Sequence, residues 1–200
     1  MYKIVLAEDQ KMLLGALGSL LDLEADMEVV GQATSGDEVI KLIEEKQPDV
    51  CLLDIEMPGK SGLEVAKLVN EMDQRPRIIV LTTFAKPGYF EKAMKARVDG
   101  YLLKDRSIEE LTTAIRKVVD GEQVYSQELM VDFIREKNPL NEREQQILKL
   151  IATGMTTKEL TTTLYLSYGT VRNYVSEIIQ KLEAKNRLEA IEIARSKGWI

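Results

Sequence analysis

Short runs of β-branched and aliphatic residues alternate with longer amphipathic segments over the first 120 residues of the chain. Several runs are nearly all apolar, which is typical of strands covered on both faces. In the amphipathic segments, apolar residues recur at the spacing of helical turns, which predicts helices. The predicted strands are Lys3–Ala7, Glu28–Gln32, Val50–Leu53, Arg77–Leu81 and Gly100–Leu103. The predicted helices are Met12–Leu23, Glu38–Glu45, Ser61–Asn70, Tyr89–Ala96 and Ile108–Val119.

Five strands that alternate with five helices predict a doubly wound α/β domain with a parallel sheet. We assign this domain residues 1–121. We expect the strand order 2-1-3-4-5, which makes the first and third strands neighbours.

The alternation stops after Gly121, and we predict a linker over residues 122–138. Ser126 is predicted to cap a short helix over Gln127–Arg135, because it precedes an apolar helical pattern. Pro139 disfavours helix at the residue before it and therefore marks a boundary. The apolar residues of the short helix are Leu129, Met130, Phe133 and Ile134.

Residues 139–200 show only helical patterns and form a predicted all-α domain. Asn141 is a good N-cap, and Glu144 three places later completes a capping box. Ser167 is predicted to cap the third helix, and Gly198 to end the fourth. The four helices span about Asn141–Thr153, Thr157–Leu164, Tyr168–Leu182 and Asn186–Lys197. The short joint between the second and third helices, Tyr165–Ser167, has the length of the turn in a helix-turn-helix.

The total charge of −6 hides two unlike regions. From Asn138 onward, nine Lys and Arg face seven Asp and Glu, a net charge of +2, whereas the rest of the chain carries −8. An acidic front and a mildly basic back suggest separate tasks.

Composition excludes several kinds of chemistry. The chain has no histidine, so it has no Ser–His or Cys–His catalytic pair and no histidine-ligated zinc site. It also cannot donate phosphate from a phosphohistidine of its own. The single cysteine, Cys51, cannot form an internal disulfide and fits a reducing compartment. With no apolar run of roughly 20 residues and no signal-peptide pattern, we expect a cytoplasmic protein without membrane insertion.

Polar groups with complementary chemistry follow four of the predicted strands. Glu8 and Asp9 come directly after the first strand, and Asp54 ends the third. Thr82 and Lys104 follow the fourth and fifth strands. Three carboxylates in one cleft call for a cation, and hard oxygen ligands suit Mg²⁺. Together with a hydroxyl and an ammonium, they are the groups that phosphoryl transfer needs.

The alternative is that polar residues simply collect where loops begin. Five such groups at the ends of four strands favour a phosphoryl-transfer site over that interpretation. The spacing alone does not identify the nucleophile among the three carboxylates.

The first 120 residues or so resemble the receiver domain of two-component response regulators. The resemblance rests on AEDQ at Ala7–Gln10, LLDIEMPGKSG at Leu52–Gly62, VLTTF at Val80–Phe84 and GYLLK at Gly100–Lys104. It implies that Asp54 accepts phosphate from a sensor histidine kinase. It further implies that Mg²⁺ is held by Glu8, Asp9, Asp54 and the backbone carbonyl of Glu56.

The same resemblance implies a switch. Lys104 would pair with the phosphoryl group and Thr82 would bond it, and Tyr101 would turn inward as Thr82 moves. The alternative for Tyr101 is an ordinary packed aromatic of a strand. The chain departs from the family at Arg97, where glycine is frequent and closes a helix at positive φ. We therefore expect that helix to end differently.

Four short helices with a charge of +2 are by themselves weak evidence for DNA binding, because small helical bundles of other purpose are common. The sequence of these helices, however, resembles the LuxR-type helix-turn-helix domain of the NarL/FixJ class over about Asn138–Gly198. The resemblance implies that the third helix reads the major groove of double-stranded promoter DNA. The expected contacts are Thr170, Arg172, Asn173 and Ser176, with Lys158 and Lys181 as phosphate contacts.

The resulting expectation is a transcription regulator that dimerises when phosphorylated, and not an enzyme. A receiver that controls catalysis or only relays phosphate is the second hypothesis. It is disfavoured because the C-terminal segment lacks histidine, a carboxylate cluster and a Gly-rich phosphate loop. A third hypothesis, a receiver that is never phosphorylated, conflicts with the intact acceptor set. The stretches MLLGALGSLL, DMEVVG, DIEMPGKSGLE and LTTFAKPGYF resemble a subfamily that regulates a fatty-acid desaturase.

Overall fold

The computed structural model describes residues 1–83, 86–135 and 137–200, apart from the side chains of Pro87 and residues 132–135. Phe84 of the VLTTF motif, Glu136 of the predicted linker, and the side chains of Phe133 and Ile134 therefore lie outside the described residues. The chain divides into two compact units, one formed mainly by residues 1–130 and the other mainly by residues 131–200. Each unit is described by itself.

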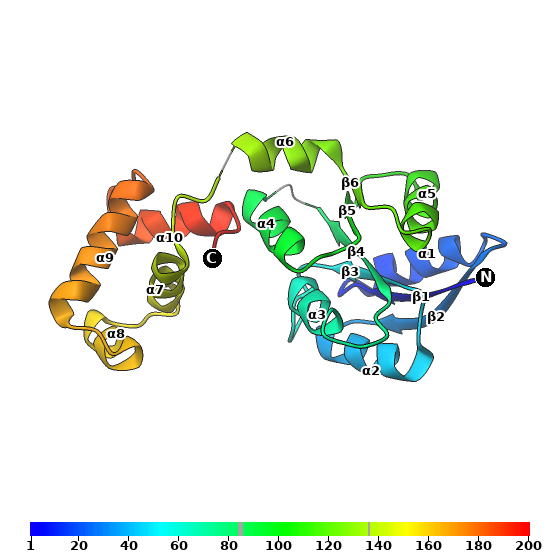
Figure 1. Ribbon diagram of the computed structural model, residues 1–200, viewed down its shortest axis with the longest axis horizontal. Helices are drawn as coiled ribbons and strands as arrows, with labels where there is room; N and C mark the ends of the chain where they lie inside the picture. Colours follow the sequence, from blue (N-terminus) through cyan, green and yellow to red (C-terminus); the bar gives the residue numbers. More distant parts are fainter. Residues whose placement is uncertain (84–85, 136) are drawn as a thin grey trace. The chain divides into compact units, whose positions relative to one another are not determined.

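The first unit is built on a parallel sheet with the order β2-β1-β3-β4-β5-β6 (Figure 1). The five predicted strands are confirmed, and so are the predicted neighbours of each. The prediction of five strands was nevertheless wrong by one, because the sheet has a sixth strand. The strands are β1 (Tyr2–Ala7), β2 (Met27–Ala33), β3 (Val50–Asp54), β4 (Arg77–Thr82), β5 (Gly100–Leu103) and β6 (Val124–Tyr125).

The sixth strand comes from the segment that the sequence predicts as linker. The backbone N–H of Val124 donates to the carbonyl of Asp99 at 3.0 Å, and that of Ser126 donates to the carbonyl of Tyr101 at 3.0 Å. The Tyr125 hydroxyl donates to the carbonyl of Val98 at 3.1 Å. A two-residue strand carries no periodicity of its own, so its pairing with β5 is visible only in three dimensions.

Helices cover both faces of this sheet (Figure 1). Beneath α1 and α5, the buried cluster includes Ile4, Leu52 and Ile79 of the strands. On the opposite face, which α2 and α3 cover, Val5, Cys51 and Val80 are fully buried. The five helices are α1 (Lys11–Leu21), α2 (Gly36–Lys46), α3 (Gly62–Val69), α4 (Pro87–Lys95) and α5 (Ile108–Val119). This double burial explains why the strands read as continuous apolar runs.

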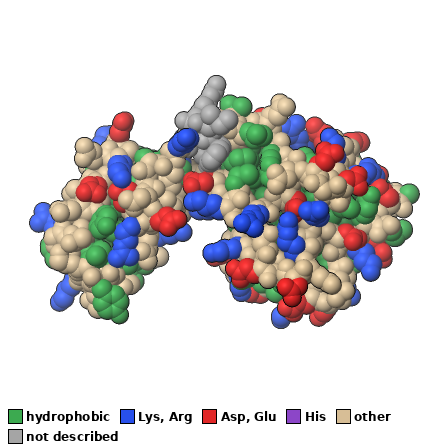
Figure 2. All heavy atoms as spheres, in the orientation of Figure 1, with side chains coloured by type: hydrophobic (Ala, Val, Ile, Leu, Met, Phe, Trp, Pro, Cys, Tyr) green, Lys and Arg blue, Asp and Glu red, His purple; other side chains and the backbone are tan. Residues whose placement is uncertain are grey.

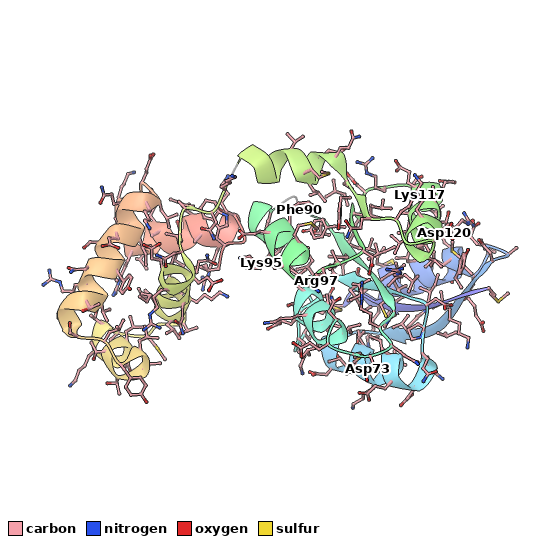
Figure 3. The ribbon with its side chains drawn as sticks, viewed as in Figure 1. Asp73, Phe90, Lys95, Arg97, Lys117 and Asp120 are labelled. Atoms are coloured by element: carbon pink, nitrogen blue, oxygen red, sulfur yellow. The ribbon has the colours of Figure 1, made fainter. Side chains whose placement is uncertain are left out.

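The end of α4 corrects one expectation. Arg97 has φ of 49°, so it adopts the left-handed conformation usually left to glycine. The backbone N–H of Val98 donates back to the carbonyl of Ala93 at 3.2 Å, which closes the helix in the usual way. Arg97 lies just past Lys95, with its side chain on the surface (Figure 3). The helix therefore ends as it would with glycine at this position. The presence of arginine instead of glycine costs only local backbone strain.

The second unit contains the helices predicted for the C-terminal part. A capping box joins Asn141 and Glu144 at the start of α7, as predicted, and Ser167 and Asn186 cap two later helices. Its core includes Leu148, Leu160, Val171 and Ile178. Its helices are α7 (Glu142–Ala152), α8 (Thr157–Leu164), α9 (Tyr168–Lys181) and α10 (Arg187–Ser196). The predicted linker helix, α6 (Gln127–Arg135), begins in the first unit and ends in the second. None of the helices within the described ranges is long and apolar enough to cross a membrane.

No block of a single charge covers the face of the molecule that Figure 2 shows. On the face shown in Figure 2, acidic and basic side chains are interspersed over both units. The net charges of the two regions therefore produce no large field of one sign on this face. Recognition of a charged partner must depend on particular side chains.

The contacts of β6 can be tested at Tyr125. Its ring lies edge to face on that of Phe90, at a centroid distance of 5.9 Å. Tyr125→Phe keeps this contact and removes the hydroxyl bond, so we expect the free energy of unfolding of the first unit to fall by about 0.5–1.5 kcal/mol. Tyr125→Ala should cost more, because it removes the ring as well. Urea unfolding followed by circular dichroism measures both, and exposed Tyr168→Phe is the control, expected near zero. If Tyr125→Phe matches that control, the hydroxyl does not anchor β6.

Candidate functional site

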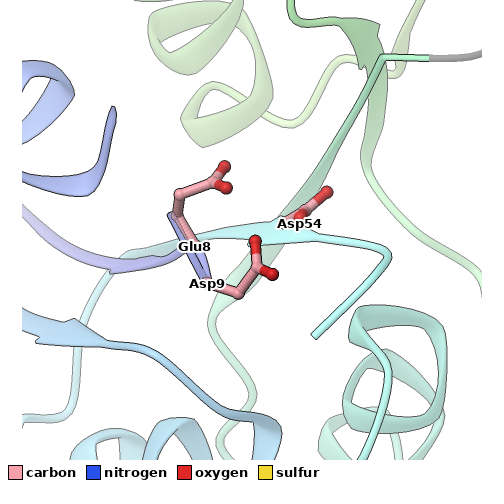
Figure 4. A group of neighbouring side chains, drawn as sticks. All are labelled: Glu8, Asp9 and Asp54. Carbon is pink, nitrogen blue, oxygen red and sulfur yellow. The ribbon is translucent and has the colours of Figure 1, made fainter. Parts of the chain in front are cut away.

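Three carboxylates converge at the carboxyl edge of the sheet. Glu8 and Asp9 follow β1, and Asp54 ends β3, which is paired with β1 up to Ala7 and Leu53. One carboxylate oxygen from each of the three lies within 4.8 Å of the others (Figure 4). Glu8 and Asp54 are buried, whereas Asp9 is exposed. The convergence predicted from strand order is confirmed.

Lys104 supplies the positive charge of this pocket. It follows β5, and its ammonium lies 2.6 Å from Oε2 of Glu8 and 2.9 Å from Oδ1 of Asp54. Its backbone N–H donates to the carbonyl of Thr82 at 2.8 Å, which fixes the start of the loop. The Lys104 side chain is only 10% exposed, so these ion pairs are largely removed from solvent. One ammonium therefore faces three carboxylates.

Burial decides the protonation behaviour of the pocket. It raises the pKa of Asp54 and of Glu8, although hydrogen bonds from Lys104 partly counteract the rise. Burial alone would lower the pKa of Lys104, but its hydrogen bonds to Glu8 and Asp54 raise that pKa overall. Both carboxyl shifts have the sign expected for carboxylates that are removed from solvent. Such a site gains stability from an added cation.

Thr82 and Tyr101 lie beside the pocket. Thr82 ends β4 and is buried, and Tyr101 on β5 has no exposed surface. The Tyr101 ring packs edge to face on Phe90, with centroids 5.5 Å apart. Phe90 belongs to α4 and points toward the sheet (Figure 3). Tyr101 thus occupies an inward position, and its movement on phosphorylation stays a prediction. Glu56 lies two residues beyond Asp54 with its side chain exposed, and the binding of Mg²⁺ by its backbone carbonyl also stays a prediction.

Sequence reasoning missed Phe90 and Tyr125 as neighbours of Tyr101. The Phe90 ring contacts both tyrosine rings in edge-to-face geometry, so three elements, α4, β5 and β6, meet at one aromatic group. Nothing in the local sequence signals this group, because Tyr125 joins it only through the pairing of β6.

In the second unit, the predicted base-reading residues lie on one side of α9. Arg172, Asn173 and Ser176 are exposed, and their spacing places them on one face of the helix. Among the described residues, these three side chains make no hydrogen bond or ion pair. Thr170 differs, because it is half-buried and its hydroxyl lies 2.8 Å from that of Ser167 at the N-cap. Lys158 on α8 is exposed.

Lys181 has an internal partner that the sequence did not reveal. Its ammonium lies 2.7 Å and 2.9 Å from the two carboxylate oxygens of Glu144, which is fully buried. Glu144 also accepts the backbone N–H of Asn141 at 2.8 Å. Lys181 therefore joins the end of α9 to the start of α7. This geometry favours a positioning role over the predicted phosphate contact.

Comparisons with known proteins agree with both halves of this description. The family described as "Response regulator receiver domain" matches residues 4–116, and "Bacterial regulatory proteins, luxR family" matches residues 138–194.

Two similar curated relatives come from Bacillus subtilis strain 168. The uncharacterised transcriptional regulatory protein YvfU is 59% identical over 200 residues, and the match covers 100% of this chain and 100% of that protein. The transcriptional regulatory protein DesR is 56% identical over 199 residues, covering 100% of this chain and 99% of that protein. Neither name specifies a target gene, so the resemblance to a desaturase regulator stays a prediction.

A solved structure is similar along the whole chain. The crystal structure of the response regulator ChrA, of a haem-sensing two-component system, covers 100% of this chain and 98% of that one, with 28% identity and a TM-score of 0.61. The likeness extends over both units.

The charge balance of the pocket can be tested at Lys104. Lys104→Met leaves Glu8 and Asp54 buried without a cation, so we expect the free energy of unfolding at pH 7 to fall by about 3 kcal/mol in the presence of a chelator. The folded-state pKa values of both carboxyls already lie above their ordinary values and would rise further without the ammonium. As pH falls from 7 toward the ordinary carboxyl pKa of about 4, the folded Lys104→Met protein takes up protons before the unfolded protein does. The loss of unfolding free energy caused by the substitution should therefore shrink.

Urea unfolding at several pH values measures this loss. Lys60→Met is the control, because the pair of Lys60 with Asp37 is largely exposed and should contribute at most about 1 kcal/mol. A penalty that does not change between pH 7 and pH 5 would contradict the assignment of Lys104 as the counter-charge.

Proposed function

The chain belongs to the response regulators that join a receiver domain to a LuxR-type DNA-binding domain, and we propose that phosphorylation of Asp54 controls its binding to promoter DNA. It is a transcription regulator, not an enzyme, in keeping with its relatives. The observation that carries the proposal is the position of Asp54. Its buried carboxylate lies between two acidic neighbours and the ammonium of Lys104.

Transfer of phosphate to Asp54 can be written as a balanced step. A carboxylate oxygen of Asp54 attacks phosphorus, the phosphorus–nitrogen bond of a phosphohistidine breaks, and the imidazole leaves with its electron pair and takes up a proton. Because the chain has no histidine, a phosphohistidine donor has to lie on another protein, for which we propose a sensor histidine kinase. Lys104 is placed to pair with the transferred group, since it already contacts the acceptor.

The residues of the pocket fit Mg²⁺. Glu8, Asp9 and Asp54 would hold the ion together with the carbonyl oxygen of Glu56, because Mg²⁺ prefers a few carboxylates and keeps several waters. The fit rests on the convergence of the three carboxylates, each of which places one oxygen within 4.8 Å of the others. When bound, Mg²⁺ supplies neutralisation of the phosphoryl oxygens.

Phosphate would act as a switch through Thr82 and Tyr101. It adds about two negative charges and strong acceptor oxygens to Asp54. The Thr82 hydroxyl would move to bond them, and the space that it vacates would hold Tyr101 in its inward position. Because Tyr101 contacts Phe90, the change reaches α4 and β6 directly. We propose that this surface, or a neighbouring one, forms the homodimer.

Binding to DNA would place α9 in the major groove, with its N-terminal part toward the base edges. Arg172 can make a bidentate contact to guanine, and Asn173 to adenine. Ser176 and Thr170 complete the proposed contact set, and Lys158 is proposed to bind phosphate. Two half-sites in the DNA require two such units, which accounts for the dimer.

Phosphorylation is tested with a small phosphodonor. With acetyl phosphate and Mg²⁺, we expect the chain to gain hydroxylamine-sensitive phosphate, and to gain none with a chelator. Asp54→Asn should abolish this labelling, because it removes the attacking oxygen. Exposed Asp37→Asn is the matched control and should be labelled like the wild type. Labelled protein should sediment as a dimer. Phosphate that persists on Asp54→Asn would place the acceptor elsewhere.

Salt dependence separates the roles of the cationic residues in the second unit. The probe is a duplex selected from a randomised library by the phosphorylated wild-type chain. Arg172→Ala should cost about 1–3 kcal/mol of binding free energy and relax sequence preference. Lys158→Ala should weaken binding and lower the slope of log affinity against log salt by about 1, because one phosphate contact is lost. Lys181→Met should weaken binding without changing that slope, because its ammonium is bound to Glu144.

Fluorescence anisotropy over a series of salt concentrations measures all three variants. A slope that falls for Lys181→Met as much as for Lys158→Ala would restore Lys181 as a phosphate contact.

A further inference from the structure

The turn between α8 and α9 carries an unusual residue. Tyr165 follows α8 directly and has φ of 54° and ψ of 44°, the left-handed conformation. Its backbone N–H and that of Leu166 both donate to the carbonyl of Thr161 and so close the helix. The Tyr165 side chain is 94% exposed, more than any other large hydrophobic or aromatic residue reported as exposed.

Two costs coincide at this position. Glycine or asparagine adopts the left-handed conformation most readily at the end of a helix, and a bulky side chain is disfavoured there. The chain itself uses glycine at positive φ after α7 and α10, at Gly154 and Gly198. An exposed aromatic ring also gains no free energy from burial. Within the described part of the chain, the Tyr165 side chain makes no hydrogen bond, ring contact or ion pair that offsets either cost.

The other non-glycine residues at positive φ have different side chains. Gln47, Arg97 and Glu183 are long and polar, and remain well solvated when exposed. Tyr165 alone among these four combines the strained backbone with a large ring. Strained positions persist where function retains them, so Tyr165 calls for a ligand outside the chain.

We propose that Tyr165 is a DNA-backbone contact, in which its hydroxyl donates a hydrogen bond to a phosphate oxygen at the edge of the groove that α9 enters. This inference rests on the proposed placement of α9. In a helix-turn-helix, the helix before the turn crosses the backbone, which brings the turn close to phosphates. A tyrosine hydroxyl is a good donor to phosphate and fixes the register of the protein on the duplex without reading sequence.

The surroundings of Tyr165 suit a polyanion. Tyr168, in the first turn of α9, is also exposed and presents a second hydroxyl at the same end of the helix. The first turn of α9 contains no acidic residue, whereas α7, α8 and α10 each have at least one there. Lys158 on α8 is exposed as well. The first turn of α9 therefore adds no negative charge that would repel DNA.

The test uses the full phosphorylated chain and the selected duplex described above. Tyr165→Asn suits the left-handed backbone better, so we expect the urea midpoint of the second unit to rise. DNA affinity should instead fall by about 10- to 100-fold, the effect of losing one hydrogen bond to a charged acceptor. The salt slope should not change, because the hydroxyl is neutral and releases no counterion. Tyr165→Phe should lose affinity to the same extent, since it lacks only the hydroxyl.

Gln47→Asn is the matched control, because Gln47 occupies the same left-handed position after α2 and the change preserves charge. It should raise the urea midpoint of the first unit and leave DNA affinity unchanged. Wild-type affinity in Tyr165→Asn would overturn the proposal, and wild-type affinity in Tyr165→Phe would overturn the hydroxyl contact. Arg172→Ala, measured in parallel, separates failure of the Tyr165 contact from failure of the proposed placement of α9. If it weakens binding while both Tyr165 variants do not, only the present inference fails. If it has no effect either, the placement of α9 fails as well.

Discussion

The excess of negative charge at the carboxyl edge of the sheet is the constraint around which the first unit is organised. Parallel pairing of β1 and β3 forces Glu8, Asp9 and Asp54 together, and the ammonium of Lys104 compensates only part of their charge. A fold optimised for stability alone would not bury two carboxylates beside a third. In the proposed function, this cluster holds the acceptor among oxygen ligands for a cation and beside a counter-charge for the phosphoryl group.

The sequence was most informative where one physical rule applies alone. Strands buried on both faces read as apolar runs, and residues that follow them must meet at one edge, so β1 to β5 and the acidic pocket could be predicted. Helix caps such as Asn141 with Glu144 could also be predicted from the sequence, because a capping box involves only residues close together in the chain. Arg97 was misjudged because the hydrogen bond that closes α4, from the N–H of Val98 to the carbonyl of Ala93, outweighs the modest cost of positive φ.

The features that the sequence did not reveal depend on partners distant in the chain. The strand β6 exists only because β5 offers an unpaired edge, and Phe90 meets Tyr125 only because β6 forms. The ion pair between Lys181 and Glu144 spans 37 residues and looks from the sequence like two separate surface charges. The segment that leaves the receiver starts as part of its sheet, beside the aromatic group that includes Tyr101. The proposed switch and the linker therefore share one structural element.

The polar residues of the second unit include two sets that evolution can treat differently. Arg172, Asn173 and Ser176 face outward and carry none of the described internal contacts, whereas Lys181 and Glu144 depend on each other. Under the proposed function, mutations in the first set alter which operator is read at little expense to folding, whereas mutations in the second set have to be matched. After a gene duplication, two copies of such a regulator can therefore diverge in their target genes while keeping one scaffold.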